Sequence, residues 1–317
     1  MAKAPNQPTT NFDSPWKEAL DLYFEPFMAF FFPQAYNDID WPKGYESLDK
    51  ELQEIVRDAE TVRRFADKLV KVWLQSGEAT FVLIHLEIQN QFQVDFPKRM
   101  HIYNHRLFDR YDREVVSVAV LGDERSDWRP TEYEYGRWGF HSRVQFPMVK
   151  LLDYQARWQD LTQSKNPFAV IVMAHLHTQA TRQNVQERFQ SKLLLVRGLY
   201  ERGYSKSEIL ELFRLIEWMM VLPDDLESEF RTELRQFEGE NQMPYITGFE
   251  RDGMVKNARE DILEVLEARF EAVPVELSDR IGSIDDQALL KQLLRRAATM
   301  PSVEAFQQTL TQNDTAN

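Results

Sequence analysis

Two alternating runs of apolar residues, joined by a short polar turn, constrain the fold of this chain more than any other feature. They cover residues 67–74 and 80–89, and Ser76 and Gly77 lie between them. Side chains that alternate with a period of two residues are typical of β-strands, and serine and glycine favour a turn. The two runs therefore predict an antiparallel hairpin.

The second run places polar residues opposite an apolar face. The even-numbered residues from 82 to 88 are aliphatic and share one face of the predicted strand, whereas His85, Glu87 and Gln89 share the other. One face can therefore pack against a core, while the other presents polar groups. Glu87 and Gln89 are the first candidates for chemistry.

An acid and a lysine occupy the neighbouring predicted strand. Asp67 begins the first run, and Lys71 lies on its face. A suitable register would bring Asp67 close to Glu87, and two nearby carboxylates repel unless a pKa rises or a hard divalent cation binds. In one interpretation, Asp67 and Glu87 hold Mg²⁺, with Mn²⁺ as a substitute. Alternatively, Glu87 and Gln89 only face solvent on an edge hairpin, and the spacing favours neither interpretation.

The order of five segments resembles that of a known nuclease family. The segments are FDSPWKEALDLYFEPF, FADKLVKVWL, FVLIHLEIQNQ, FPKRMHIYNHRLFDRY and VVSVAVLGDE. They are similar to the recombination-promoting nuclease and transposase family of the PD-(D/E)XK superfamily, and the similarity runs from about residue 12 to residue 310. The resemblance implies an α/β fold with a restriction-endonuclease-like core, in which helices flank a mixed sheet. It also implies a metal-dependent DNA endonuclease linked to recombination or transposition.

The resemblance assigns roles to individual residues. The superfamily pattern is an acid on one strand and acid-x-lysine on the next, which falls here on Asp67, Glu87 and Gln89. Gln89 stands in place of lysine, and an amide can orient a water molecule but cannot supply positive charge. Lys71, or Lys17 from the first helix, is expected to supply that charge. The departure keeps two other functions open, an inactive nuclease-fold module that binds or regulates and an interaction protein built on the helical half.

Three further residues are candidates for the same site. The resemblance makes Asp13 an auxiliary acid, although its position before Pro15 favours a helix cap, for which Ser14 is the other candidate. Arg99 and Tyr103 lie one helical turn apart, and a similarly placed helix in related nucleases lines the DNA groove. Both are therefore expected to bind DNA, although Tyr103 could equally pack in the core.

The composition limits the available sites and partners. The chain has no cysteine, which excludes thiolate metal ligands and favours a reducing cytoplasm. Its net charge of -13 argues against nucleic-acid binding through bulk electrostatics, although the segment from Lys98 to Arg113 is locally basic. No apolar segment is long enough for a membrane span, so we expect no membrane partner.

The periodicity divides the chain into regions. We expect a disordered segment over residues 1–11, a nuclease-like core over 12–165, a helical region packed on it over 166–252, and a small helical domain over 253–317. Within the core, a short helix is expected around residues 45–56. The last domain resembles one of unknown function that is often appended to this family. Its amphipathic helices make a second copy of the chain a candidate partner.

Overall fold

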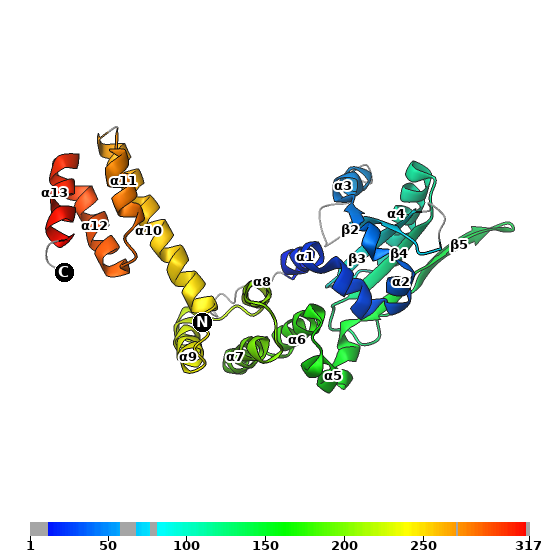
Figure 1. Cartoon of the computed structure of the whole chain (residues 1–317). Coiled ribbons are helices and arrows are strands. Elements are labelled where there is room, and N and C mark those ends of the chain that lie inside the picture. Colours follow the sequence, from blue (N-terminus) through cyan, green and yellow to red (C-terminus); the bar gives the residue numbers. More distant parts are fainter. Residues whose placement is uncertain (1–11, 58–67, 77–80, 271, 315–317) are drawn as a thin grey trace, which may run out of the picture. The chain divides into compact units, whose positions relative to one another are not determined.

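The computed structural model describes residues 12–57, 68–76, 81–270 and 272–314 (Figure 1). The chain has an α/β fold, with a mixed five-stranded sheet and helices that make up most of the rest. It divides into two compact units, residues 1–232 and 233–317. No helix in the described ranges is long and apolar enough to cross a bilayer.

The five-stranded sheet belongs to the first unit and has the order β1-β2-β3-β4-β7. β2 (Lys68–Trp73) and β3 (Phe81–Gln89) are antiparallel, with Lys68 opposite Leu86. The hairpin prediction is therefore confirmed. β1 (Tyr45–Ser47) pairs with the outer edge of β2.

A helical crossover joins the two central strands. β4 (Val115–Leu121) runs parallel to β3, and parallel neighbours need a connection that returns along the sheet. α4 (Phe96–Tyr111) provides it, and Asp112 ends the helix in a left-handed conformation with a φ of 48°. β4 is buried from Ser117 to Leu121, and β7 (Met148–Lys150) pairs with it in parallel.

Helices cover both faces of the sheet. Leu107 of α4 packs with Leu83 of β3 and with Leu52 of α3 (Asp49–Arg57), which places both helices on the face that carries Glu87. On the opposite face, Asp21 of α1 (Asp13–Phe31) forms an ion pair of 2.5 Å with Lys68. The central strand β3 is therefore buried between the helices, so its polar residues need partners.

The remaining elements complete the two units. The bounds are α2 (Pro33–Asp38), η1 (Trp41–Lys43), β5 (Glu132–Arg137), β6 (Phe140–Gln145), η2 (Leu151–Arg157), α5 (Trp158–Gln163), α6 (Pro167–Ala180), α7 (Val185–Glu201), α8 (Lys206–Met219), α9 (Asp224–Glu240), α10 (Ile246–Phe270), α11 (Val275–Gly282), α12 (Gln287–Thr299) and α13 (Val303–Asp314). β5 and β6 form a separate two-stranded sheet. The second half of the chain is helical, as its periodicity predicts.

Three local features differ from the sequence-based expectation. The first helix begins at Asp13, and Phe12 takes the cap position without a side-chain hydrogen bond, so neither Asp13 nor Ser14 caps it. Residues 45–47 pair as strand β1 instead of beginning a helix, because β2 offers them a hydrogen-bonding edge. The expected domain boundary at residue 252 falls inside α10, and the two units divide 20 residues earlier, between residues 232 and 233.

A substitution in the core of the second unit tests whether the chain divides into two units that unfold separately. Leu293 of α12 is fully buried in that core, so Leu293→Ala should destabilise the second unit by roughly 2 to 5 kcal/mol. All seven tryptophans lie at or before Trp218, within the first unit. In urea unfolding we expect the variant to shift the loss of helical circular dichroism while the tryptophan fluorescence transition stays unchanged. Leu212→Ala, in the buried part of α8, should shift the fluorescence transition instead. An equal fluorescence shift with Leu293→Ala would contradict the division.

Candidate active site

Glu87 lies at the centre of the candidate site and is fully buried on β3. Arg99, from the first turns of α4, donates hydrogen bonds to its carboxylate: Nη2 lies 2.6 Å from Oε2, and Nε lies 3.2 Å from the same oxygen. Charge-assisted bonds from two guanidinium nitrogens to one carboxylate are among the strong ones in proteins. The buried charge of Glu87 is therefore paired.

Gln89 shares the same guanidinium nitrogen. Its Oε1 accepts a hydrogen bond of 2.8 Å from Nη2 of Arg99, while its Nε2 donates to the main-chain oxygen of Gln91 at 2.5 Å. The second bond fixes the amide so that its oxygen, not its nitrogen, points toward Arg99. A carboxylate oxygen and an amide oxygen thus converge on one cationic nitrogen.

The protonation of Glu87 follows from its neighbours. Burial alone would raise the pKa of the Glu87 carboxyl, but the charge of Arg99 and the imidazole of His85 outweigh it and lower the pKa to about 2. Nε2 of His85 lies 3.6 Å from Oε1 of Glu87, and Nδ1 is 3.1 Å from the hydroxyl of Ser117. Glu87 is therefore ionised at neutral pH.

The oxygen atoms of this cluster suit a hard divalent cation. Mg²⁺ prefers carboxylate and amide oxygens, and Glu87 Oε2 and Gln89 Oε1 already flank the positively charged nitrogen of Arg99. Asp67, the other metal ligand expected beside Glu87, lies outside the described residues. Within the described ranges, no group of three or more His, Asp or Glu side chains could hold a metal ion by itself.

The other residues predicted for the site lie elsewhere or have other contacts. Lys71 forms an ion pair of 3.1 Å with Glu46 on β1, and Lys17 is exposed on α1, on the opposite face of the sheet. The positive charge beside Glu87 comes instead from Arg99. Tyr103 is 2% exposed and packs edge-on against His85, with ring centroids 5.7 Å apart.

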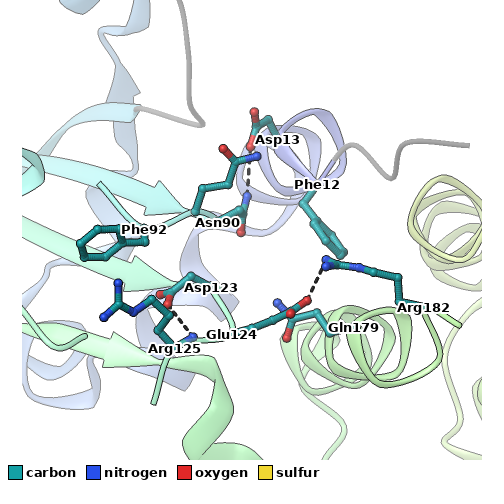
Figure 2. Close-up of a pocket in the computed structure, with 10 residues that line it drawn as sticks. Phe12, Asp13, Asn90, Phe92, Asp123, Glu124, Arg125, Gln179 and Arg182 are labelled. Atoms are coloured by element: carbon teal, nitrogen blue, oxygen red, sulfur yellow. Dashed lines mark hydrogen bonds and ion pairs between the residues drawn. The ribbon is translucent and has the colours of Figure 1, made fainter. Parts of the chain in front are cut away.

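Asp13 lies in a polar pocket at the carboxyl ends of β3 and β4. The pocket has a volume of about 360 Å³, and this edge of a parallel sheet is where α/β proteins commonly bind ligands. Figure 2 shows Asp13 accepting a hydrogen bond of 3.0 Å from Nδ2 of Asn90, with Asp123 and Gln179 on other sides of the pocket. The carboxylate of Asp13 thus holds the loop after β3.

A buried ion pair near this pocket was missed by sequence reasoning. The side chain of Lys150 is fully buried and pairs with Asp123, and its ammonium lies 5.6 Å from the ring centre of Trp128. Lys150 neighbours Leu121 in the sheet, and Leu121 neighbours Gln89. The position of Asp123 directly after a buried strand was the available signal, but nothing in the sequence showed that its partner follows 27 residues later.

His175 is fully buried and has a packing role. It lies in α6, where its Nδ1 accepts a hydrogen bond of 3.2 Å from Trp16 and its Nε2 donates one of 2.8 Å to the main-chain oxygen of Gly122. Burial lowers the pKa of His175 to about 4, so the ring is neutral. This imidazole joins α1, α6 and the end of β4 below the pocket.

Measurements of stability at acidic pH test whether Glu87 is ionised in the folded protein. Because folding lowers the pKa of Glu87, its ionised carboxylate stabilises the folded protein at pH values above the ordinary pKa of 4.5. This contribution to the free energy of unfolding is lost as the pH falls from 4.5 toward 2. The contribution is about 3 kcal/mol, and Glu87→Gln removes it. Urea unfolding followed by tryptophan fluorescence should show the variant less stable than the parent at pH 7, with the gap narrowing in acid. A gap that does not change with pH would contradict an ionised Glu87.

A substitution at Gly122 tests how closely the chain after β4 approaches Asn90 and His175. An added Cβ would contact Oδ1 of Asn90 and lie 2.8 Å from Cε1 of His175, so Gly122→Ala forces one of them to move. We expect a loss of roughly 1 to 3 kcal/mol in the free energy of unfolding. Gly198→Ala is the matched control, because its Cβ would meet only Nε of Arg202, at 4.0 Å, and alanine favours the helix. Equal stability of Gly122→Ala and the parent would show that the contact is loose.

Comparison with protein-family models, curated proteins and solved structures gives no match to this chain. The resemblance of the five segments to a nuclease family therefore stays a prediction. A function for this chain has to be argued from the contacts that join Glu87, Gln89 and Arg99.

Proposed function

We propose that this protein is a Mg²⁺-dependent DNA endonuclease with its active site at Glu87. The observation that carries the proposal is the convergence of Glu87 Oε2 and Gln89 Oε1 on one cationic nitrogen. The mixed sheet with helices on both faces agrees with a restriction-endonuclease-like core, which the proposal includes. We also propose that the protein is cytoplasmic, which the absence of cysteine supports.

The residues have distinct roles in the proposed hydrolysis of a phosphodiester. Asp67 and Glu87 would hold the metal ion, which would supply positive charge to a phosphate oxygen. Asp67 is joined to Lys68, and Lys68 pairs with Leu86, the neighbour of Glu87. Gln89 would orient the attacking water, and the lowered pKa of Glu87 keeps its carboxylate available at neutral pH.

Arg99 would exchange partners during the reaction. Its guanidinium now neutralises Glu87, with a side chain that is 9% exposed. A phosphate offers the same bidentate acceptor geometry as a carboxylate. We propose that a bound phosphate draws Arg99 away from Glu87 and that Arg99 then steadies this phosphate.

The same contacts support a second candidate, a nuclease-fold protein that binds DNA or regulates without cutting. Arg99 already bonds the carboxylate of Glu87 and the amide oxygen of Gln89, so the cluster is electrically balanced with protein groups alone. Gln89 also lacks the charge of the lysine expected at its position. This candidate predicts DNA binding without cleavage.

Cleavage of supercoiled and linear DNA separates the two candidates. The parent should cut in Mg²⁺ or Mn²⁺ and not in chelator, and Glu87→Gln and Asp67→Asn should each lower the rate by about 100-fold or more, because each removes a metal-binding charge. Glu46→Gln makes the same chemical change on β1, where Glu46 pairs with Lys71, and should leave cleavage unchanged.

Two outcomes would reject the endonuclease. One is a folded parent that cuts DNA in neither metal. The other is cleavage that survives both Glu87→Gln and Asp67→Asn, which would indicate another site or a contaminant.

A further inference from the structure

A groove on the outer side of α4 combines cations with aromatic rings. It has a volume of about 450 Å³ and lies between α4 and the hairpin of β5 and β6. Its lining residues are Lys98, His101, Ile102, His105, Arg106, Tyr133 and Tyr135. None of them is acidic, in a chain with a net charge of -13. We call this surface the α4–hairpin groove.

The hairpin carries its acidic and its tyrosine side chains on opposite faces. In β5, Tyr133 and Tyr135 face one side, so Glu132 and Glu134 face the other. On that other side Glu132 accepts a hydrogen bond of 3.0 Å from Nε of Arg143. The carboxylates of β5 are thus turned away from the groove.

The tip of the hairpin exposes a tryptophan in an unfavourable conformation. Trp138 is 95% exposed and has a φ of 55°, and Gly139 follows with a φ of 86°. Such turns favour asparagine and glycine, because a bulky residue with positive φ is strained. Figure 1 shows β5 extending beyond the edge of the five-stranded sheet. A strained, exposed tryptophan on a projecting hairpin is typical of a contact residue.

The aromatic surface continues from the tip into the groove. Phe140 is 60% exposed and lies 5.8 Å from Tyr135 between ring centroids, and Tyr135 lies 5.5 Å from His101. Burial and the neighbouring His105 lower the pKa of His101, so this ring at the floor is neutral at pH 7. The fixed charges therefore lie at the rim, on Lys98 and Arg106.

We propose that the α4–hairpin groove and Trp138 bind single-stranded DNA. Lysine and arginine at the rim would contact phosphates, and exposed aromatic rings would stack on bases. A single strand fits better than a duplex, because a duplex hides the faces of its bases. The proposal rests on the proposed function and names the form of DNA that the endonuclease would hold.

The groove and the candidate active site share one helix. Arg99 points from α4 toward Glu87, whereas the preceding residue, Lys98, lines the groove. A strand bound in the groove would therefore lie along the helix that supplies the counter-ion of Glu87. This places DNA binding and the proposed chemistry on the two sides of α4.

Fluorescence anisotropy in the presence of chelator tests the proposal without cleavage. The probes are a labelled single strand of mixed sequence and the duplex of the same sequence. Trp138→Ala and Lys98→Gln should each weaken single-strand binding by about 5- to 100-fold. Lys98→Gln should also reduce the salt dependence by about 0.7 in slope, the value for one lost phosphate contact. Trp218→Ala and Lys165→Gln change an exposed tryptophan and an exposed lysine elsewhere, and should bind as the parent does.

Three results would overturn the proposal. They are a folded parent that does not bind the single strand, tighter binding of the duplex than of the single strand, and binding that survives both Trp138→Ala and Lys98→Gln. Self-association lost in Trp138→Ala, without affinity for DNA, would assign the surface to a second copy instead. Binding is measured in chelator, where no metal-dependent cleavage occurs, so a failure of cleavage and a failure of this groove are distinguishable.

Discussion

The buried ion pair between Glu87 and Arg99 is the interaction on which the rest of this structure depends. A carboxylate in the middle strand of a covered sheet would cost several kcal/mol without a partner. Arg99 supplies that partner only if α4 lies directly over β3, where Leu107 also packs. The ion pair and the packing of Leu107 together hold the crossover helix over β3.

Other buried charges of the sheet are paired in the same way. Lys68 reaches Asp21 on α1 at 2.5 Å and Asp49 on α3 at 3.1 Å, and Lys150 pairs with Asp123 after β4. Each pair joins a strand to a different part of the chain. Breaking a buried pair is costly because the remaining charge has no water around it. The charges thus limit how the helices can be arranged on the sheet.

Local sequence patterns predicted the individual helices and strands better than they predicted the contacts between them. The hairpin and α4 were predictable because their periods of two and 3.6 residues are local properties. The prediction that Asp13 caps the first helix was wrong, because its carboxylate accepts a hydrogen bond from Asn90, 77 residues away in the sequence. The role of Arg99 as counter-ion was missed for the same reason, since its contact with Glu87 depends on how α4 packs. Strand β1, at three residues, is too short to give a pattern.

The succession of Lys98 and Arg99 on α4 has a mechanical consequence. Neighbouring residues on a helix point about 100° apart, so one rigid rod carries a groove-facing ammonium and a core-facing guanidinium. Any turn of this rod about its axis that moves Lys98 also changes the distance between Arg99 and Glu87. Binding on the outer side of α4 that rotates the helix would thus change the interaction between Arg99 and Glu87 inside the sheet.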